Sequence, residues 1–272
     1  MIKLENYEVM GWEHAIRGMR NPMNSWEKSD SGFSCCGDET CKNCSSNFHC
    51  THQGTTYNIG PNDHELMMKL ANGGSVHAKY RRMITVYVDI TAPLYWWKEF
   101  DTYKVGTVAN SCSTMHKIHS KRFEREDFSI EYLTNHLEKH WMVCMDNIIS
   151  SLNVARERYL ETKDKKYWWQ MIQLLPSSYN QKRTVMLNYE VLANIYKSRC
   201  NHKLDEWREF CKWIKSLPYS NLITEPSLSD IPIAKEIMKE AERRVEVRIA
   251  KQCETWLKLF EINLTNGTDF TG

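Results

Sequence analysis

Residues 83–100, MITVYVDITAPLYWWKEF, decide the fold of this chain. Between Ile84 and Ile90, every second side chain is apolar, and the side chains between them are polar or aromatic. This alternation predicts a β-strand with one buried face. Ala92-Pro93 ends the strand, and Leu94–Phe100 is predicted to be a helix, because proline is well tolerated next to a helix's first turn. The stretch therefore predicts a strand that turns directly into a helix.

The chain before this stretch predicts one more strand and two helices. Residues 1–10 suit an edge strand, and Trp12–Met19 reads as a short helix with its apolar residues on one side. From Asn21 to Asn58 the periodicity is lost, and serine, glycine and asparagine predict a long loop, of a kind that is usually functional or held by something. A second helix is predicted with Asn62 as its N-cap and with its end at Gly73-Gly74.

The chain after this stretch is predicted to be mostly helical. Residues 105–120 are small and polar and predict a loop. Apolar spacing then predicts the helices Tyr132–Tyr159, Lys166–Leu175, Thr184–Lys197, Leu204–Leu217 and Ile233–Phe260. We expect residues 1–220 to form one domain with an insertion at 24–60, and residues 221–272 to form a C-terminal helical extension.

Composition excludes several classes of protein. With 36 basic and 34 acidic side chains the net charge is +2, so no polybasic surface for polymeric nucleic acid is expected. The longest apolar runs are far shorter than the roughly 20 residues that span a bilayer. Charged residues near the start and the lack of an apolar core there predict no signal peptide. We expect a cytoplasmic protein without a membrane partner, whose ten cysteines are mainly reduced.

Five of these cysteines lie in the predicted loop. They are Cys35, Cys36, Cys41, Cys44 and Cys50, accompanied by His49 and His52. Cys41-x-x-Cys44 has the spacing of half a zinc site, and Cys35 or Cys36 with Cys50 or His52 could complete four ligands. A second Cys-x-x-Cys is missing from the loop. Structural zinc, reduced thiols and redox pairing therefore stay open.

Ordered landmarks along residues 1–220 resemble the flavin-dependent thymidylate synthase family. The stretch from Tyr7 to Gly11 is similar to the family's opening strand, and residues 88–100 are similar to the strand and helix that lead into its signature motif. Asn188 and Arg199 recur at similar spacing further along. The resemblance, to a divergent bacterial or phage-type member, implies an α+β fold: a central antiparallel sheet flanked by helices, with a helical C-terminal half.

The signature motif itself is altered. The family carries Arg-His-Arg followed by Ser-x-Asn-Glu-x-Ser-x-Arg-Tyr, whereas this chain has Thr102-Tyr103-Lys104. With one inserted residue, Asn110 and Ser113 keep the family's residue types. Two further arginines are replaced, one by Met115 and one by Glu190. Neither residue can reproduce a bidentate guanidinium contact to phosphate, so other cations must make it or the ligand differs.

The resemblance implies two sets of site residues. The nucleotide-binding set is Glu99, Lys104, Asn110, Ser113, Arg199 and His202, with Ser113 also taken as catalytic. The cofactor-binding set is Arg82, Tyr103, Lys104, Asn188 and Lys182. Each has a structural alternative: Arg199 can satisfy carbonyls at a helix end, Ser113 can form a turn, and Arg82 can be a solvated residue before a strand.

The function implied by the resemblance is methylation of dUMP with FAD, NADPH and methylenetetrahydrofolate, in a homotetramer whose sites are shared between subunits. Two alternatives remain from the altered motif. One is a nucleotide-binding protein that sequesters its ligand without turnover, and the other is one-carbon modification of another pyrimidine nucleotide.

Overall fold

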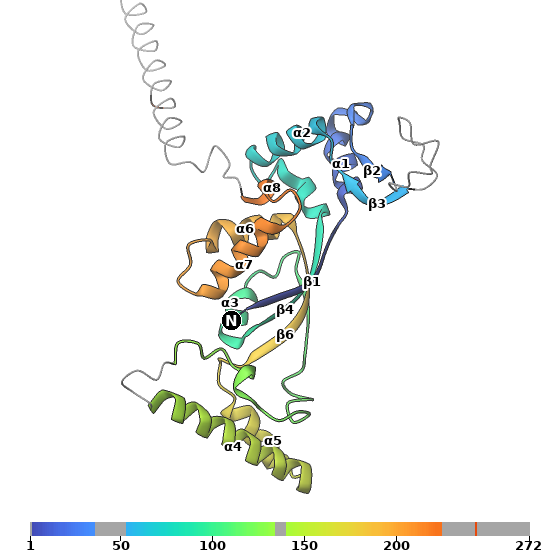
Figure 1. Cartoon of the computed structure of the whole chain (residues 1–272). Helices are drawn as coiled ribbons and strands as arrows, with labels where there is room; N and C mark the ends of the chain where they lie inside the picture. The colour runs from blue at the N-terminus through green and yellow to red at the C-terminus, as the bar shows by residue number, and fades with distance from the viewer. Residues whose placement is uncertain (1, 36–52, 134–139, 225–242, 244–272) are drawn as a thin grey trace, which may run out of the picture. The chain divides into compact units, whose positions relative to one another are not determined.

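A computed structural model describes residues 2–35, 53–133, 140–224 and 243 of the chain (Figure 1). The chain divides into two compact units, Met1–Glu225 and Pro226–Gly272, and the elements below belong to the first. The predicted helix Ile233–Phe260 lies outside the described residues except for position 243. The predicted domain boundary at residue 220 stays a prediction.

A four-stranded antiparallel sheet forms the centre of the first unit. Its strands lie in the order β1 (Lys3–Met10), β4 (Thr85–Pro93), β6 (Asn180–Asn188) and β5 (Val108–Ser111). The predicted strand at residues 1–10 and the alternating strand before Ala92-Pro93 are both confirmed. The α+β class with a central antiparallel sheet is confirmed as well.

Strand β6 corrects one sequence prediction. Thr184–Lys197 was expected to be a helix, but residues 180–188 pair with β4 along their whole length. Val185 and Leu187 are buried while Thr184 is exposed, so the period of two was present in the sequence. Helix α6 (Tyr189–Arg199) begins only after Asn188, whose side chain accepts a hydrogen bond from Val191 N at 3.0 Å and caps it. Strand β5 is a second correction, because residues 105–120 were expected to be loop only.

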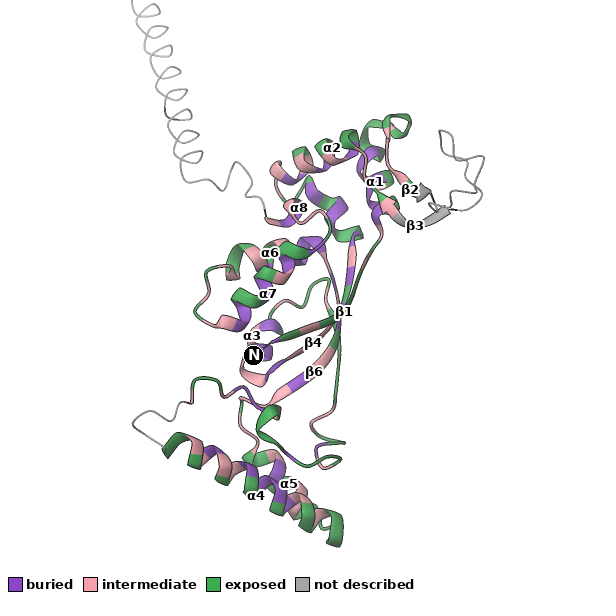
Figure 2. Cartoon of the chain, in the orientation of Figure 1, coloured by how far each residue is buried: buried purple, intermediate pink, exposed green. Residues whose placement is uncertain are grey.

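One face of the sheet is covered by helices. These are α3 (Leu94–Phe100), α6 and α7 (Asp205–Ser216), which share one core with β4 and β6 (Figure 2). Trp96, Trp97 and Trp207 are fully buried there, so the tryptophan pair after Pro93 packs in the core. Helix α1 (Trp12–Arg20), predicted from Trp12, packs on the same core.

The other face of the sheet is open. Paired residues of an antiparallel sheet share a face, so Tyr87 and Met186 lie together, as do Asp89 and Thr184. Tyr87 is 40% exposed, and Val108, which pairs with Met186 from β5, is 60% exposed. This open face therefore combines apolar and polar side chains in contact with solvent.

The predicted long loop contains a β-hairpin. Strand β2 (Gly32–Cys35) pairs with β3 (Gln53–Asn58), and the register places Cys35 opposite Gln53. Two short 3-10 helices, η1 (Asn21–Met23) and η2 (Trp26–Lys28), precede it. The expectation of a loop without regular structure was therefore wrong at both ends of the insertion. Residues 36–52 lie outside the described residues.

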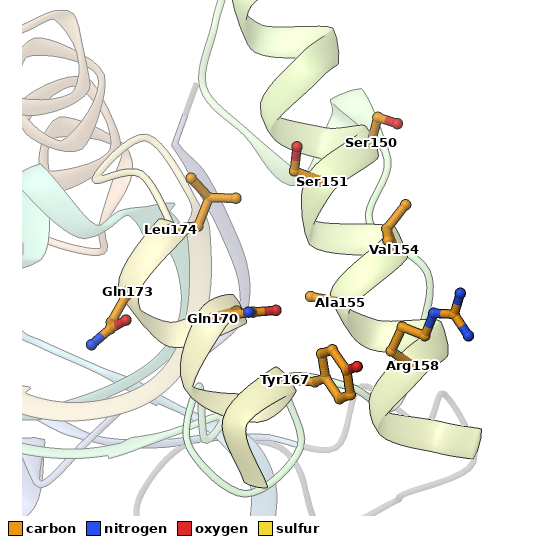
Figure 3. Close-up of a pocket in the computed structure, with 9 residues that line it drawn as sticks. All are labelled: Ser150, Ser151, Val154, Ala155, Arg158, Tyr167, Gln170, Gln173 and Leu174. Atoms are coloured by element: carbon orange, nitrogen blue, oxygen red, sulfur yellow. The ribbon is translucent and has the colours of Figure 1, made fainter. Parts of the chain in front are cut away.

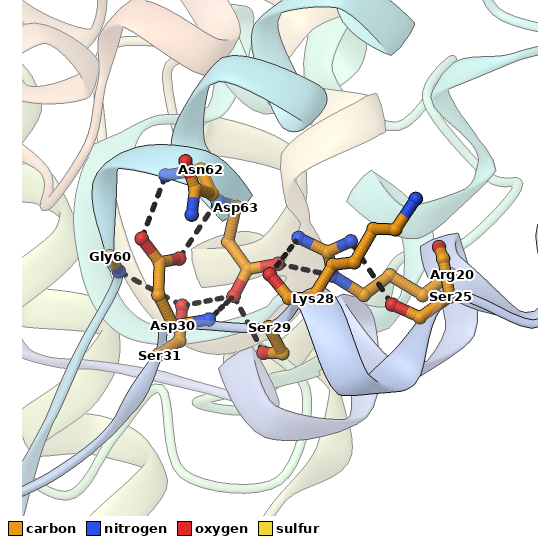
Figure 4. A network of polar contacts seen from close by, with 9 residues as sticks. All are labelled: Arg20, Ser25, Lys28, Ser29, Asp30, Ser31, Gly60, Asn62 and Asp63. Carbon is orange, nitrogen blue, oxygen red and sulfur yellow. Dashed lines mark hydrogen bonds and ion pairs between the residues drawn. The ribbon is translucent and has the colours of Figure 1, made fainter.

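A buried ion pair closes the base of this insertion (Figure 4). The Asp63 carboxylate is fully buried and accepts hydrogen bonds from Arg20 Nε at 2.6 Å, from the hydroxyls of Ser29 and Ser31 at 2.7 Å each, and from Asp30 N at 3.1 Å. Burial alone would raise the pKa of Asp63, but the hydrogen bonds from Ser31, Ser29 and Arg20 outweigh it and lower the pKa. We call these five residues the clamp.

Helix α2 (Pro61–Asn72) begins differently from the prediction. The helix starts at Pro61, and Asn62 lies inside its first turn. The Asp30 carboxylate accepts hydrogen bonds from the backbone of Asn62 at 2.9 Å and of Asp63 at 3.1 Å. The Asp30 side chain, 32 residues before Asn62, therefore supplies the cap that the sequence prediction assigned to Asn62. The predicted end at Gly73 is confirmed.

Helices α4 (His140–Thr162) and α5 (Lys165–Leu174) pack on each other around a second, smaller core. Both were predicted, although the first was expected to begin at Tyr132, which lies in a turn. The buried amide of Asn153 accepts from Phe123 N at 2.9 Å and donates to Phe123 O at 3.0 Å, which ties the preceding loop to α4. The remaining short elements are η3 (Ala78–Met83), η4 (Arg125–Asp127) and α8 (Asn221–Thr224). Among the helices described, none is long and apolar enough to cross a membrane.

Candidate functional site

An ion pair between Arg199 and Glu99 forms the centre of the candidate site. Arg199 lies at the last turn of α6 and Glu99 near the end of α3, and their Nη1 and Oε2 atoms are 2.7 Å apart. The indole N–H of Trp207 donates to the same Glu99 oxygen at 2.9 Å. Buried Trp207 therefore fixes the carboxylate, which in turn orients the guanidinium.

Two more predicted residues complete this group. Arg199 Nε donates to the Tyr103 hydroxyl at 3.0 Å, and His202 Nε2 lies 3.5 Å from Glu99 Oε2. Leu204 N donates to His202 Nδ1 at 3.2 Å, so a neutral His202 carries its proton on Nε2, facing Glu99. Sequence positions 99, 103, 199 and 202 thus meet at one place, which we call the dyad site.

The dyad site keeps free hydrogen-bonding atoms. The side chains of Arg199 and Glu99 are 20% and 35% exposed. Within the described chain, Arg199 Nη2 and Glu99 Oε1 have no partner, although the other polar atoms of both groups are engaged. A carboxylate oxygen beside a guanidinium N–H complements a ligand edge on which an N–H lies beside an acceptor atom, as on a pyrimidine base.

A second group of predicted residues lies on the open face of the sheet. Asn110 pairs with Thr184 in the β5–β6 ladder, and Lys182 Nζ lies 3.1 Å from Asp89. Hydrogen bonds from Thr184, Asn6 and Lys182 lower the pKa of Asp89 to about 2. Lys182 therefore has a partner that is ionised at neutral pH, and any ligand anion must compete with it.

Ser113 lies in the loop beyond β5. Its hydroxyl oxygen accepts hydrogen bonds from Met115 N at 3.2 Å and His116 N at 2.9 Å, which makes a local turn. In the part of the chain that is described, no histidine or carboxylate side chain bonds to this hydroxyl. Ser113 therefore lacks the base that an activated serine nucleophile needs, and its arrangement suits a ligand contact.

The sheet separates these two groups. The dyad site belongs to the helix layer on the covered face, whereas Lys182 and Asn110 point to the open face. Asn188 is used as the cap of α6, and Arg82 and Lys104 are exposed without a bond to another described residue. One copy of the chain therefore does not bring all predicted ligand contacts together.

The start of α6 lacks the groups that the phosphates of the implied flavin would need. A pyrophosphate needs fixed cations or backbone donors. Glu190 instead places a buried carboxylate in the first turn of α6, 3.6 Å from Arg81, and Thr102 adds no charge. This turn does not fit a pyrophosphate. Within the predicted cofactor-binding set, Arg82 and Lys104 are exposed cations of the described chain that could contact one.

The predicted metal ligands Cys41, Cys44 and Cys50 lie outside the described residues, and Cys35 is described only as the end of β2. Elsewhere in the described ranges, no cluster of three or more histidine, cysteine or acidic side chains could hold a metal ion.

A groove of about 520 Å³ lies between α4 and α5 (Figure 3). It is lined by the apolar side chains of Ala155 and Leu174, among others, and by Arg158, Tyr167 and two glutamines. None of the predicted site residues lines it. The groove is therefore a feature separate from the dyad site.

Sequence reasoning missed two contributors to these groups. Trp207 was taken only as part of an amphipathic helix, and its indole N–H contact with Glu99 has no signal in the sequence. Asp89 was assigned to the polar face of its strand, and its pairing with Lys182 depends on the β4–β6 register.

Comparisons with known proteins support the fold. No known family profile and no curated protein sequence matches the chain. Two crystal structures of thymidylate synthase X from Helicobacter pylori, with FAD and dUMP, match with TM-score 0.54 and 16% identity, over 82% of this chain and 96% of that chain. A UMP/dUMP methylase, PolB from Streptomyces cacaoi bound with 5-Br dUMP, gives TM-score 0.48 and 12% identity, over 84% and 95%. The expected resemblance to flavin-dependent thymidylate synthase is confirmed at the level of the fold.

Proposed function

We propose that this protein, built on the fold of flavin-dependent thymidylate synthase, binds a pyrimidine nucleotide at the dyad site and methylates it. The substrate is dUMP or a closely similar nucleotide. FAD, NADPH and methylenetetrahydrofolate are the expected cofactor and co-substrates.

The observation that carries this proposal is the meeting of Glu99, Tyr103, Arg199 and His202. These residues lie as much as 103 positions apart in the chain, yet hydrogen bonds and an ion pair join them directly. The ring nitrogen N3–H of uracil can donate to Glu99, while a neighbouring carbonyl accepts from Arg199. A base held in this way is positioned by two charge-assisted bonds, which are stronger than neutral ones.

A second copy of the chain supplies the remaining contacts. Lys182, Asn110 and Ser113 belong to the open face and its edge, so they reach a nucleotide only if it is bound by the dyad site of another subunit. The exposed apolar side chains of the same face support association, because burying them is favourable. We therefore propose a homotetramer with shared sites.

Flavin, when bound, supplies the hydride chemistry of the reaction. The chain's own residues position the nucleotide base through Glu99 and Arg199. Lys182, which the resemblance placed in the cofactor-binding set, is assigned instead to the nucleotide phosphate, which it reaches from the other subunit. Arg82 and Lys104 are the cations assigned to the phosphates of the cofactor, and Tyr103 is assigned to its ring.

The second candidate function is capture of a nucleotide without turnover. Glu190 and Thr102 favour it, because a cofactor pyrophosphate has no fixed partner at either position. The dyad site would serve both functions equally.

One experiment separates the two. The purified protein is denatured, the released small molecules are identified by mass and by visible spectrum, and NADPH oxidation is measured with and without dUMP. Released flavin together with dUMP-dependent oxidation supports the enzyme. A colourless protein that binds dUMP supports capture, and a protein that binds no pyrimidine nucleotide overturns both.

A further inference from the structure

Arg81 and Glu190 form a buried ion pair with incomplete hydrogen bonding. Both residues are more than nine-tenths buried, and the nearest charged atoms, Arg81 Nη1 and Glu190 Oε2, are 3.6 Å apart. This distance exceeds that of a hydrogen bond. Arg81 Nε and Glu190 Oε2 are both buried and have no hydrogen-bond partner in the described part of the chain.

The clamp shows what a fully bonded pair looks like in the same molecule. The Arg20–Asp63 contact is 2.6 Å long, and three further donors satisfy the Asp63 carboxylate. Buried charges normally need such partners, because desolvation is costly. Arg81 and Glu190 leave hydrogen-bonding atoms unused at their contact. The surroundings of the Arg81 guanidinium are therefore not optimised for the Glu190 carboxylate.

The location of the pair favours anions in general. Glu190 is the second residue of the 11-residue helix α6, where backbone N–H groups and the helix dipole attract negative charge. Gly106 packs against the same turn, since an added Cβ would lie 2.8 Å from Asn188 Nδ2. The hydroxyl of the next residue, Thr107, is also buried without a partner among the described residues.

We propose that Arg81 and the first turn of α6 form an oxyanion-binding position that the chain fills with its own Glu190 carboxylate. Glu190 thereby determines specificity, because it excludes a phosphate group from this position. A cofactor or nucleotide bound beside α6 must then present an uncharged group there. This inference concerns one anion position and does not rest on the proposed methylation.

The test removes the internal carboxylate and supplies an external oxyanion, pyrophosphate. Thermal unfolding of wild type, Glu190→Ala and Glu190→Gln is followed during titration with sodium pyrophosphate, and potassium chloride of matched ionic strength serves as reference. Both variants are expected to unfold at a lower temperature than wild type. Pyrophosphate at ten times its dissociation constant should raise their Tm by roughly 3–6 °C above the salt reference, while wild type shows no such rise.

Two control variants make the result specific. Glu206→Ala removes another buried glutamate from the first turn of a helix, α7, but Glu206 bonds to the Tyr95 hydroxyl, and no ion pair joins it to a cation of the described residues. It should gain no response to pyrophosphate. The double variant Arg81→Met with Glu190→Gln should lose the response that Glu190→Gln gains.

Calorimetry with pyrophosphate checks the same inference without unfolding, and binding to Glu190→Gln should be at least about tenfold tighter than to wild type. Equal responses of wild type and both Glu190 variants would overturn the proposal and leave the pair as a purely structural contact. Glu190→Gln covers the case in which Glu190→Ala fails to fold, because glutamine keeps the side-chain volume.

Discussion

Arg199 contacts three side chains of its own protein, and each contact orients it before any ligand arrives. Glu99 binds one Nη atom, Tyr103 accepts from Nε, and the guanidinium carbon lies 4.8 Å from the centre of the Trp207 ring. A preoriented cation loses little side-chain freedom on binding, so more of its interaction energy appears as affinity. The arrangement also explains why a lysine would not replace it.

Arg199→Ala should weaken nucleotide binding while the protein stays folded. Losing a charge-assisted contact costs about 1.5–3 kcal/mol, which is roughly ten- to a hundredfold in affinity for dUMP. Calorimetry measures the affinity, and circular dichroism checks the fold. Arg122→Ala is the matched control, because Arg122 pairs with Glu157 on the surface and lies outside the dyad site. Equal dUMP affinity of wild type and Arg199→Ala would remove Arg199 from the site.

The residues of the dyad site were predictable one by one, through resemblance to a family, but their contacts with one another were not. Nothing in the sequence shows that Glu99 and Arg199 are 2.7 Å apart, since this depends on how α3 and α6 pack on the same face of the sheet. Trp207 has the spacing of a core residue, and it is one. Its second use, as a donor to Glu99, can be read only from the structure.

At the scale of elements, the clamp joins α1, the start of the insertion and α2 through one carboxylate. Asp63→Asn should destabilise the fold by about 3–5 kcal/mol at neutral pH, because the buried Arg20 loses its counter-charge. The folded-state pKa of Asp63 lies below its unfolded value. Its stabilisation is therefore present above the unfolded pKa and is lost as pH falls through the folded pKa.

Urea unfolding at a series of pH values measures this. The difference between wild type and Asp63→Asn should shrink progressively below about pH 4. Asp146→Asn is the control, since Asp146 pairs with Arg125 on an exposed surface and its loss should change stability little. A difference that stays constant down to pH 2 would show that the charge of Asp63 does not matter.

The hairpin of β2 and β3 gives the cysteine-rich segment between them a defined base. Cys35 lies opposite Gln53 in the hairpin. The entropy cost of bringing these two residues together is therefore already met by the pairing of β2 with β3. If the segment holds zinc, elemental analysis after dialysis should find about one metal per chain, with cysteine sulfurs at about 2.3 Å by X-ray absorption. If the protein contains no metal and a chelator does not change its thermal stability, these cysteines do not bind zinc and are reduced thiols.

Most elements followed from the sequence, and the failures share a physical cause. Residues 184–188 of β6 were assigned to a helix because the apolar positions of α6 continue without a Gly or Pro break into the strand. The boundary is set by the Asn188 cap and by pairing with β4, a partner about 95 residues away. The cap of α2 was likewise assigned to a neighbour, although it comes from Asp30. Both errors arise where a distant residue overrides local preference.

At the scale of the whole molecule, the two groups of predicted contacts lie on opposite sides of the sheet. A mixture of two variants that each bind dUMP weakly, Arg199→Ala and Lys182→Met, should therefore recover part of the dUMP binding when the chains are refolded together. In a random mixture about one quarter of the sites would combine an intact Arg199 with an intact Lys182 from different subunits. Either variant refolded alone is the control. If the mixture recovers no dUMP binding, the two residues do not meet at a site shared between subunits. Either both belong to a site within one subunit, or one of them is not part of the site.

The pairing of Cys35 with Gln53 also has a consequence for how this chain can change over generations. The strands β2 and β3 hold Cys35 and Gln53 opposite each other, and doubling the length of a flexible loop between two fixed ends costs only about 0.6 kcal/mol. A change of length between these two residues is therefore expected to cost the described hairpin little if the inserted residues are flexible. A lineage can acquire or discard a binding function there in one genetic event, and an engineer can graft a reporter peptide at the same place.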